Sequence, residues 1–193
     1  MLFRSDYDIL LRFLDGIYPR VIDLYRTFLE NDIADCYFIV GAEFAGPPLA
    51  APAHFKELSA RYVRGICDLI RSYGKTSIVH YHGQLLEVLS GFRDMDPDGL
   101  HTVELPPTGN CTLQQARAVL GPEMALIGPV QYDDLVRLTA EEIEAQVIDA
   151  IQAGSGGRFI LSPTAGPYET QIDDRTVQNY LTLIDAGLKY GRL

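Results

Sequence analysis

His80 and His82, which are separated by a single residue, are the side chains of this sequence best placed for chemistry. They follow the β-branched run 76–79 and precede Gly83, a residue typical of turns. Residues two apart in a strand point to the same face, roughly 6.5–7 Å from each other along the chain. We therefore expect both imidazoles to project together from a strand end, as half of a metal site or as a polar pair at a pocket mouth. The alternative is that each histidine has a separate hydrogen-bond partner.

Five short apolar segments predict the β-strands that position these side chains. Each is apolar on both faces and is followed by glycine or proline, a pattern typical of parallel strands covered on both sides. The predicted strands span residues 35–40, 76–80, 101–105, 124–128 and 158–162.

Amphipathic segments with readable ends predict the helices between the strands. Apolar residues at spacings of three and four mark a helix over 55–73, with Gly74 at its C-cap. The segments 112–115 and 139–142 have the form of capping boxes. Asp173 or Asp174 can cap a last helix, and a first helix is expected over 17–30 with Pro19 in its first turn.

Repeated strand–helix units predict a parallel sheet with right-handed crossovers. Five strands could form an open doubly wound sheet or part of a (β/α)₈ barrel, which typically needs about 250 residues. The chain has 193 residues, so length alone favours the open sheet.

Polar residues gather just after the predicted strands, at the carboxyl ends where such folds carry out chemistry. The candidates are three catalytic residues, Glu43, Glu104 and Tyr168, and three substrate-binding residues, Gly128, Gln131 and Glu169. Glu104 could accept a hydrogen bond from a histidine or ligate a metal; alternatively it is a loop carboxylate bonded to backbone N–H groups. His54, at a helix start, and His101, at a strand start, are expected to be structural.

Composition excludes several classes of function. With 47% hydrophobic and 22% charged residues, the sequence is typical of one globular domain, here taken as 1–193. A net charge of −10 argues against nucleic acid as a partner. No stretch reaches about 18 apolar residues, so no membrane segment is expected. Three dispersed cysteines suit a reducing compartment, and we expect a cytoplasmic protein.

Three segments resemble the uroporphyrinogen decarboxylase superfamily: GKTSIVHYHGQLLEVLSGF, ELPPTGNCTLQQARAVLGPEMALIGPVQYDDLVRLTAEEIEAQV and GGRFILSPTAGPYETQIDDRTVQNYLTLIDAGLKYG. This superfamily includes the porphyrin-pathway decarboxylase and the cobalamin-dependent methyltransferases that act on thiols or methoxylated compounds. The resemblance runs from about Asp8 to the end of the chain. It implies an α/β fold that is the C-terminal part, about five βα units, of a TIM (β/α)₈ barrel, with the first strands of the barrel not represented.

The resemblance is closest to the methyltransferase-like branch and suggests a zinc site. Thiol methyltransferases carry His-x-Cys at this strand end and a later cysteine. Here His80 matches the first ligand, His82 replaces the cysteine, and Ala165 stands near the later cysteine and cannot ligate. The histidine pair with Glu104 or Glu43 would restore three ligands for zinc, which would deprotonate an acceptor thiol or polarise a methoxy oxygen. A corrinoid carried by a partner protein would bring the methyl group.

Two further functions stay open at this point. The first is a lyase activity, the decarboxylation of a tetrapyrrole. In the decarboxylases the catalytic aspartate and the arginines that bind substrate lie largely in the strands that this chain does not represent. A complementing N-terminal chain would have to supply them. The second is a non-catalytic subunit or remnant of a split barrel. Exposed sheet edges also predict self-association into a homo-oligomer or pairing with the complementing chain.

Overall fold

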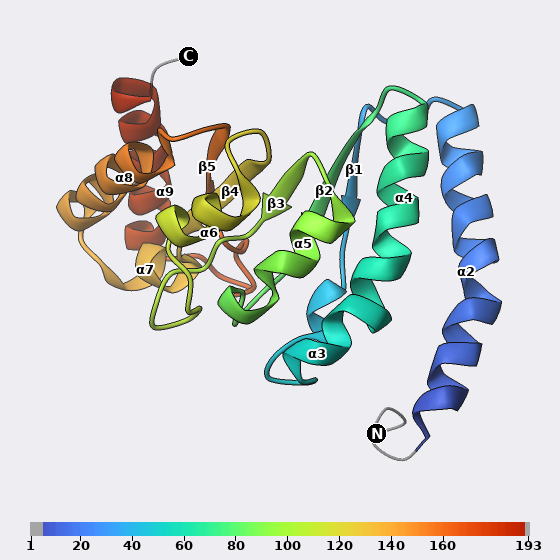
Figure 1. Ribbon diagram of the computed structural model, residues 1–193. Helices are drawn as coiled ribbons and strands as arrows, with labels where there is room; N and C mark the ends of the chain where they lie inside the picture. Colours follow the sequence, from blue (N-terminus) through green and yellow to red (C-terminus); the bar gives the residue numbers. More distant parts are fainter. Residues whose placement is uncertain (1–5, 192–193) are drawn as a thin grey trace.

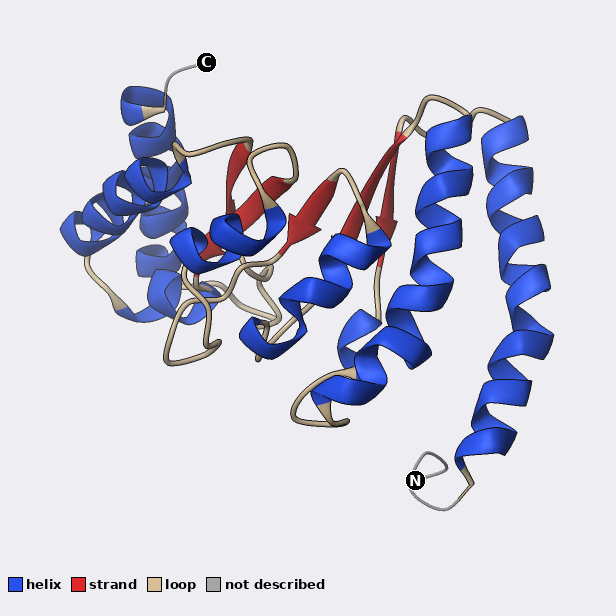
Figure 2. Ribbon diagram, viewed as in Figure 1, coloured by secondary structure: helices blue, strands red, loops and turns tan. Residues whose placement is uncertain are grey.

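The computed structural model describes residues 6–191 and contains one five-stranded parallel sheet (Figures 1 and 2). The strands are β1 (Cys36–Ile39), β2 (Thr76–His80), β3 (Gly99–His101), β4 (Ala125–Val130) and β5 (Phe159–Pro163). Their order in the sheet follows their order in the chain, and every neighbouring pair is parallel. A doubly wound sheet reverses its strand order at a switch point. The uninterrupted order instead matches part of a (β/α)₈ barrel, as the resemblance implies.

The first helix is longer than the sequence suggests. Helix α2 (Tyr7–Glu30) begins at its cap Asp6, whose side chain accepts a hydrogen bond from the Ile9 amide. Pro19 therefore lies in the interior of the helix, so the prediction that it stands in the first turn is wrong. The apolar pattern continues on both sides of the proline, because α2 packs along α4 (Arg61–Ser72).

The segment predicted as one helix over 55–73 is divided in three. It consists of α3 (Pro52–Phe55), a π-helical turn (Lys56–Ala60) and α4. The C-cap of α4 is Tyr73, and Gly74 follows with a φ of +71°, a conformation that glycine adopts without strain. The predicted end of the helix is thus correct to one residue.

The remaining helices follow their capping signals. Both predicted capping boxes are formed, by Thr112 with Gln115 and by Thr139 with Glu142. They open α6 (Leu113–Leu120) and α8 (Ala140–Gly154), and Asp173 caps α9 (Asp174–Tyr190). Two 3₁₀ turns and two short helices complete the chain: Ala42–Ala45, Leu86–Val88, α5 (Leu89–Met95) and α7 (Tyr132–Arg137).

Strand β3 occupies a different place from the one predicted. It spans Gly99–His101 instead of 101–105, because Gly99 pairs with Ile78 of β2 and Ala125 of β4. His101 is consequently at the carboxyl end of its strand, not at the amino end. Glu104 lies in the loop beyond it.

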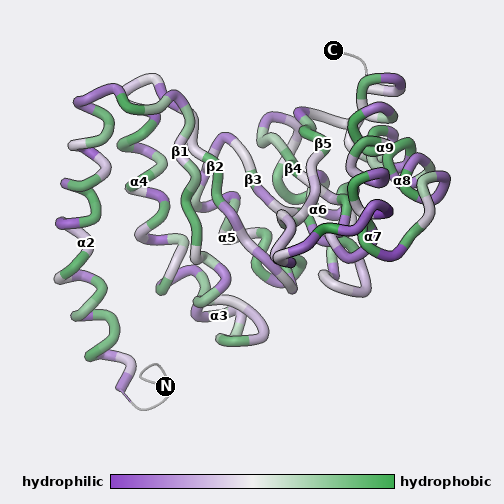
Figure 3. The backbone as a smooth tube through the Cα atoms, turned by 180° about the vertical axis from the view of Figure 1, so that it is seen from behind, coloured by the Kyte–Doolittle hydropathy of each residue, from purple (hydrophilic) through white to green (hydrophobic). Residues whose placement is uncertain are grey.

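The two faces of the sheet differ in their cover. Helices α4, α5 and α6 lie across one face, where Val79, Leu100 and Leu126 are fully buried (Figure 1). The reverse view shows no helix in front of β1, β2 or β3 (Figure 3). On that uncovered face Phe38 and Ile160 stay 48% and 50% exposed.

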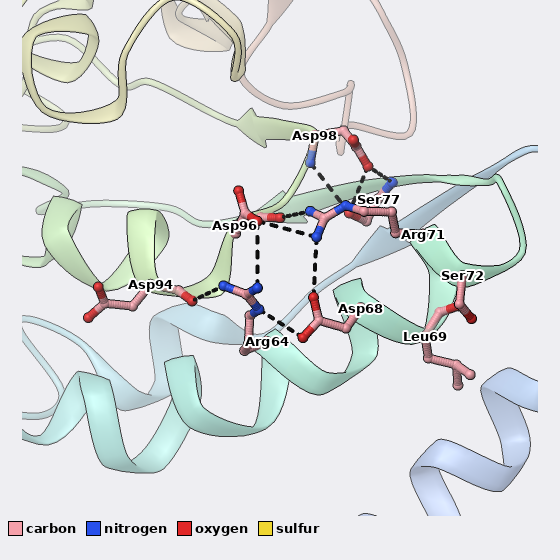
Figure 4. A network of polar contacts seen from close by, with 9 residues as sticks. All are labelled: Arg64, Asp68, Leu69, Arg71, Ser72, Ser77, Asp94, Asp96 and Asp98. Carbon is pink, nitrogen blue, oxygen red and sulfur yellow. Dashed lines mark hydrogen bonds and ion pairs between the residues drawn. The ribbon is translucent and has the colours of Figure 1, made fainter.

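A polar network fastens the amino ends of the strands to α4 and α5 (Figure 4). Asp98 accepts hydrogen bonds from the amide and the hydroxyl of the buried Ser77, at 2.8 and 3.0 Å. Arg71 reaches the Asp96 carbonyl, and Arg64 pairs with Asp68 at 2.8 Å. These contacts set the register between β2 and β3 at the end of the sheet opposite the histidines.

Among residues 6–191, no helix combines the length and apolar character needed to cross a lipid bilayer.

Candidate functional site

Strand β2 delivers two histidines to the carboxyl end of the sheet. His80 is its last residue, and His82 follows two positions later. The ring centroids are 4.4 Å apart, with the rings nearly perpendicular. The prediction that both imidazoles project together is confirmed.

A third histidine joins them from β3. His101 is the direct strand partner of His80, and the two Nδ1 atoms are 2.6 Å apart. The rings are almost parallel, with centroids 4.8 Å apart. Phe38 of β1 packs against both, at 5.6 Å from His80 and 5.3 Å from His101. The expectation that His101 lies at the amino end of its strand is therefore wrong, because β3 ends at His101 and its side chain lies beside His80.

Glu104 holds His82 in place. Its side chain is almost fully buried, and its Oε1 lies 3.0 Å from His82 Nδ1. Its Oε2 accepts a hydrogen bond of 2.6 Å from the Gly83 amide. Glu104 thus combines two of the roles considered for it, because it accepts from a histidine and from a backbone N–H group.

The histidines differ in their electrostatics. Burial, and then the charge of His82, lowers the pKa of His80 to about 4. The hydrogen bond to Glu104 raises the pKa of His82 above its ordinary value, against the effect of burial. Burial alone would raise the pKa of Glu104, but its hydrogen bonds from His82 and Gly83 outweigh this and lower it. At neutral pH His80 is therefore neutral, whereas the contact between His82 and Glu104 favours the charged form of each partner.

Glu43 approaches the same group from the 3₁₀ turn after β1. Its Oε2 is buried and has no hydrogen-bond partner. Its negative charge contributes to the raised pKa of His82. Glu104 contacts His82 and the charge of Glu43 acts on it, but neither carboxylate is among the wall residues of the cavity at the histidines.

The other predicted residues lie apart from the histidines. Gly128 has a φ of +133°, and a Cβ there would lie 2.8 Å from Thr102 Oγ1, so its role in the structure is a close backbone approach. The Gln131 Oε1 accepts from Thr164 Oγ1 at 3.2 Å, while its Nε2 is buried without a partner. Gln131 lines a separate cavity of about 660 Å³ between α6 and α8.

Tyr168 and Glu169 belong to a cluster around α7. The Tyr168 ring meets Tyr132 edge to face, with centroids 4.9 Å apart, and its hydroxyl donates to Asp133. Glu169 accepts from the Tyr132 hydroxyl. Neither residue lines the cavity at the histidines.

That cavity measures about 550 Å³ and is open to solvent on the uncovered side of the sheet. Its walls are the three histidines, the segment 162–167 and Tyr180. No arginine or lysine is among these wall residues. Sequence reasoning gave His101 a structural role at the start of the strand predicted over 101–105, and the available signal was a polar residue at the edge of an apolar segment.

Comparison with known proteins identifies the family of this chain. The family model described as uroporphyrinogen decarboxylase (URO-D) matches residues 3–180. The chain belongs to the uroporphyrinogen decarboxylase family. No curated protein sequence matches it.

A solved methyltransferase structure shares the fold of this uroporphyrinogen decarboxylase family member. A methyltransferase from Methanosarcina mazei aligns with a TM-score of 0.73 and 20% identity, over 94% of this chain. The alignment covers 50% of the methyltransferase, so the chain spans half of that protein's length. A D-psicose 3-epimerase from Clostridium cellulolyticum H10, with D-tagatose, aligns at a TM-score of 0.49 and 14% identity over 93% of the chain and 72% of the epimerase.

The donor atoms of this family member suit zinc by type but are not preassembled. Imidazole nitrogens and carboxylate oxygens are ordinary zinc ligands, and the buried, unpartnered Glu43 oxygen is one such donor. Two histidine nitrogens on one tetrahedral ion lie about 3.3 Å apart, whereas His80 and His101 are hydrogen-bonded at 2.6 Å through Nδ1. Within residues 6–191, no three His, Cys, Asp or Glu side chains are arranged to hold a metal ion. Glu43 or Glu104 would have to turn toward His80 and His82 to complete a site.

Proposed function

We propose that this chain is the C-terminal part of a methyltransferase-like barrel that transfers a methyl group from a corrinoid, carried by a partner protein, to a small acceptor. The observation that supports this most is the juxtaposition of His80, His82 and Glu104 at the carboxyl end of a parallel sheet. In barrels of this kind, residues at that end carry the chemistry. The name of the Methanosarcina mazei relative points the same way, at the level of fold.

Each residue at the mouth has a distinct task in this proposal. His80 and His82 would hold zinc, with Glu43 or Glu104 turned toward them as the third donor. Glu104 also orients His82, as carboxylates behind metal-bound histidines commonly do. When bound, zinc lowers the pKa of an acceptor thiol so that the thiolate is available at neutral pH. Phe38 packs against His80 on one side.

A tetrapyrrole decarboxylase is less well supported. Its substrate carries several carboxylates, which need arginine or lysine partners when they leave water. The cavity at the histidines has no such residue in its walls, and the whole chain carries a net charge of −10. A complementing chain would have to supply every arginine or lysine that pairs with the substrate carboxylates.

Zinc binding gives the first test. We expect the 193-residue chain to bind one Zn²⁺ by calorimetry and elemental analysis. His80→Ala and His82→Ala should each abolish this binding, and the matched control His54→Ala should leave it unchanged. Unchanged zinc content in both site variants would contradict the metal site.

Methyl transfer gives the second test. Methylcobalamin and a small thiol are incubated with the zinc-loaded chain, alone and with the N-terminal half of the barrel supplied as a second polypeptide. Loss of the methylcobalamin absorbance that depends on His80 supports the proposal. Zinc binding without any such demethylation in either mixture favours the non-catalytic subunit.

A further inference from the structure

A second cavity lies between α6 and α8, two neighbouring helices on the covered face of the sheet (Figure 1). Its volume of about 660 Å³ is in the range of small-molecule sites. The loop after β3, the start of α6, the end of β4, α7 and one side of α8 form its walls, and none of these wall residues lines the cavity at the histidines. The edge strands β1 and β5 contribute nothing to the walls, so the cavity does not depend on what covers those edges.

One part of the wall is apolar and suits the body of a small organic molecule. Leucine, proline and valine side chains form this part: Leu105, Pro106, Pro107, Leu113, Pro129 and Val130. On the α8 side the wall includes two short side chains, Ala150 and Ala153. A ligand with an apolar body would be stabilised here by leaving water.

Gln131 supplies a hydrogen-bond donor that has no acceptor in the protein part that the structure describes. It follows β4 directly and is a wall residue of the cavity. Its Oε1 accepts from Thr164 Oγ1 at 3.2 Å, while its Nε2 is buried and has no partner within residues 6–191. A buried N–H group without an acceptor is unfavourable, and an oxygen of a bound molecule would satisfy it.

The charged residues of the wall favour a cation over an anion. Arg137 is the one basic wall residue, and it pairs with Asp133 at 3.5 Å. Asp134 accepts a hydrogen bond from the neutral amide of Gln146 at 2.9 Å. Asp149 is exposed on α8 and forms no ion pair with another described residue. Two carboxylates therefore lack a positive partner, and they would repel an anionic ligand.

We propose that this cavity binds a small organic cation that carries an uncharged oxygen acceptor on an apolar body, such as an amino amide. The oxygen accepts from Gln131 Nε2, the ammonium group pairs with the carboxylates of Asp134 and Asp149, and the apolar body contacts the leucine and proline side chains. This site is separate from the zinc and methyl-transfer chemistry proposed above and does not rest on it.

Tryptophanamide is a suitable probe because it combines an ammonium group, an amide oxygen and an apolar ring. The chain contains no tryptophan, so the fluorescence anisotropy of the probe reports binding without a background from the protein. We expect tryptophan, which adds a carboxylate, and indole-3-propionamide, which lacks the ammonium group, each to bind about 10-fold more weakly, as loss of one charge-assisted contact implies.

Three variants test the three parts of the wall. Gln131→Met removes the donor at similar length, Asp149→Asn removes the exposed charge, and Ala153→Phe places a ring in the cavity. We expect each to weaken tryptophanamide binding about 10-fold or more. Asp185→Asn is the matched control, because it removes the same charge from an exposed position of α9 outside the walls and should leave binding unchanged.

The outcomes are decisive even where Gln131→Met or Ala153→Phe does not fold. No binding of tryptophanamide to the wild-type chain overturns the proposal, and so does equal binding of tryptophan and tryptophanamide. Equal effects of Asp149→Asn and Asp185→Asn would show that the net charge of the chain attracts the probe without a specific site. Binding that is lost in Asp149→Asn and kept in Asp185→Asn supports the site. Zinc content measured on the same samples tests the proposed function independently.

Discussion

Glu104 is the residue on which the charge distribution around His80 and His82 depends. It is buried, and its two oxygens each accept one hydrogen bond, from His82 and from Gly83. Glu104→Gln removes the negative charge and turns an N–H group toward one of these donors. We expect the pKa of His82 to fall and zinc affinity to drop about 10- to 100-fold. A proton NMR titration of His82 and zinc calorimetry measure the two effects.

The control for this change is Glu123→Gln. Glu123 is exposed and pairs with Arg158 on the surface, so its replacement should leave both quantities unchanged. A His82 pKa that is the same in Glu104→Gln and in the wild type would show that the carboxylate does not govern this histidine.

His80 makes stability depend on pH. Its pKa is about 4 in the folded chain and about 6.5 in an unfolded one, so the unfolded chain binds more protons between these values. The contribution of His80 to the free energy of unfolding is therefore fully present above pH 6.5 and is lost as the pH falls toward 4. We expect the free energy of unfolding in urea to decrease between pH 7 and pH 4.5, and to decrease less in His80→Asn.

The comparison between variant and wild type isolates His80 from its neighbours. The pKa of His101 is also lowered and acts in the same direction, whereas the raised pKa of His82 acts in the opposite one. Equal losses of stability in the wild type and in His80→Asn would show that the lowered pKa of His80 is not a source of the pH dependence.

The sequence was sufficient for part of this site. His80 and His82 could be placed because their spacing matches the period of a strand. Glu104 could be placed because it stands near the end of the next predicted strand, directly before the turn at Pro106. His101 could not, because its position depends on which residues of two strands pair. That register is fixed by contacts 21 residues apart in the chain, such as the one between Ser77 and Asp98.

At the scale of the elements, local signals located helix ends more reliably than strand positions. The capping boxes at Thr112 and Thr139 are formed because each needs only residues within one turn. The start of α2 was misplaced because Pro19 is tolerated inside a helix that packs on α4. Strand β3 was misplaced because a short apolar run does not show which of its residues enter the ladder.

The network at the amino end of the sheet should affect stability without affecting the site. Asp98→Ala leaves the buried amide and hydroxyl of Ser77 without their acceptor, at a cost of about 1–3 kcal/mol in the free energy of unfolding. Zinc affinity should not change, because the histidines lie at the opposite end of the strands. Urea denaturation and zinc calorimetry on the same variant measure both.

Asp94→Ala is the matched control for this element. Asp94 forms an exposed ion pair with Lys56, so its loss should alter stability by no more than about 0.5 kcal/mol. A stability loss in Asp98→Ala no larger than in this control would show that the network does not hold β2 and β3 together.

At the scale of the whole molecule, the sheet within residues 6–191 has two unpaired edges, β1 and β5, and no described helix lies over β1, β2 or β3 on one of its faces (Figure 3). Apolar side chains stand at these edges: Val40 is 67% exposed and Ile160 is 50% exposed. Open edges of this kind associate with other strands unless charges or cover prevent it. A complete barrel would bury both edges, and the chain spans half of its Methanosarcina mazei relative.

We therefore expect the 193-residue chain on its own to self-associate through these edges at micromolar concentration. Val40→Lys combined with Ile160→Lys should shift it toward the monomer, because lysines at sheet edges disfavour strand pairing. Gln114→Lys combined with Gln152→Lys adds the same charge on exposed helix positions and should leave association unchanged. Sedimentation velocity measures the outcome. If both double variants dissociate equally, net charge governs the association and the edges do not; if wild type is already monomeric, the exposed apolar edges are tolerated without a partner.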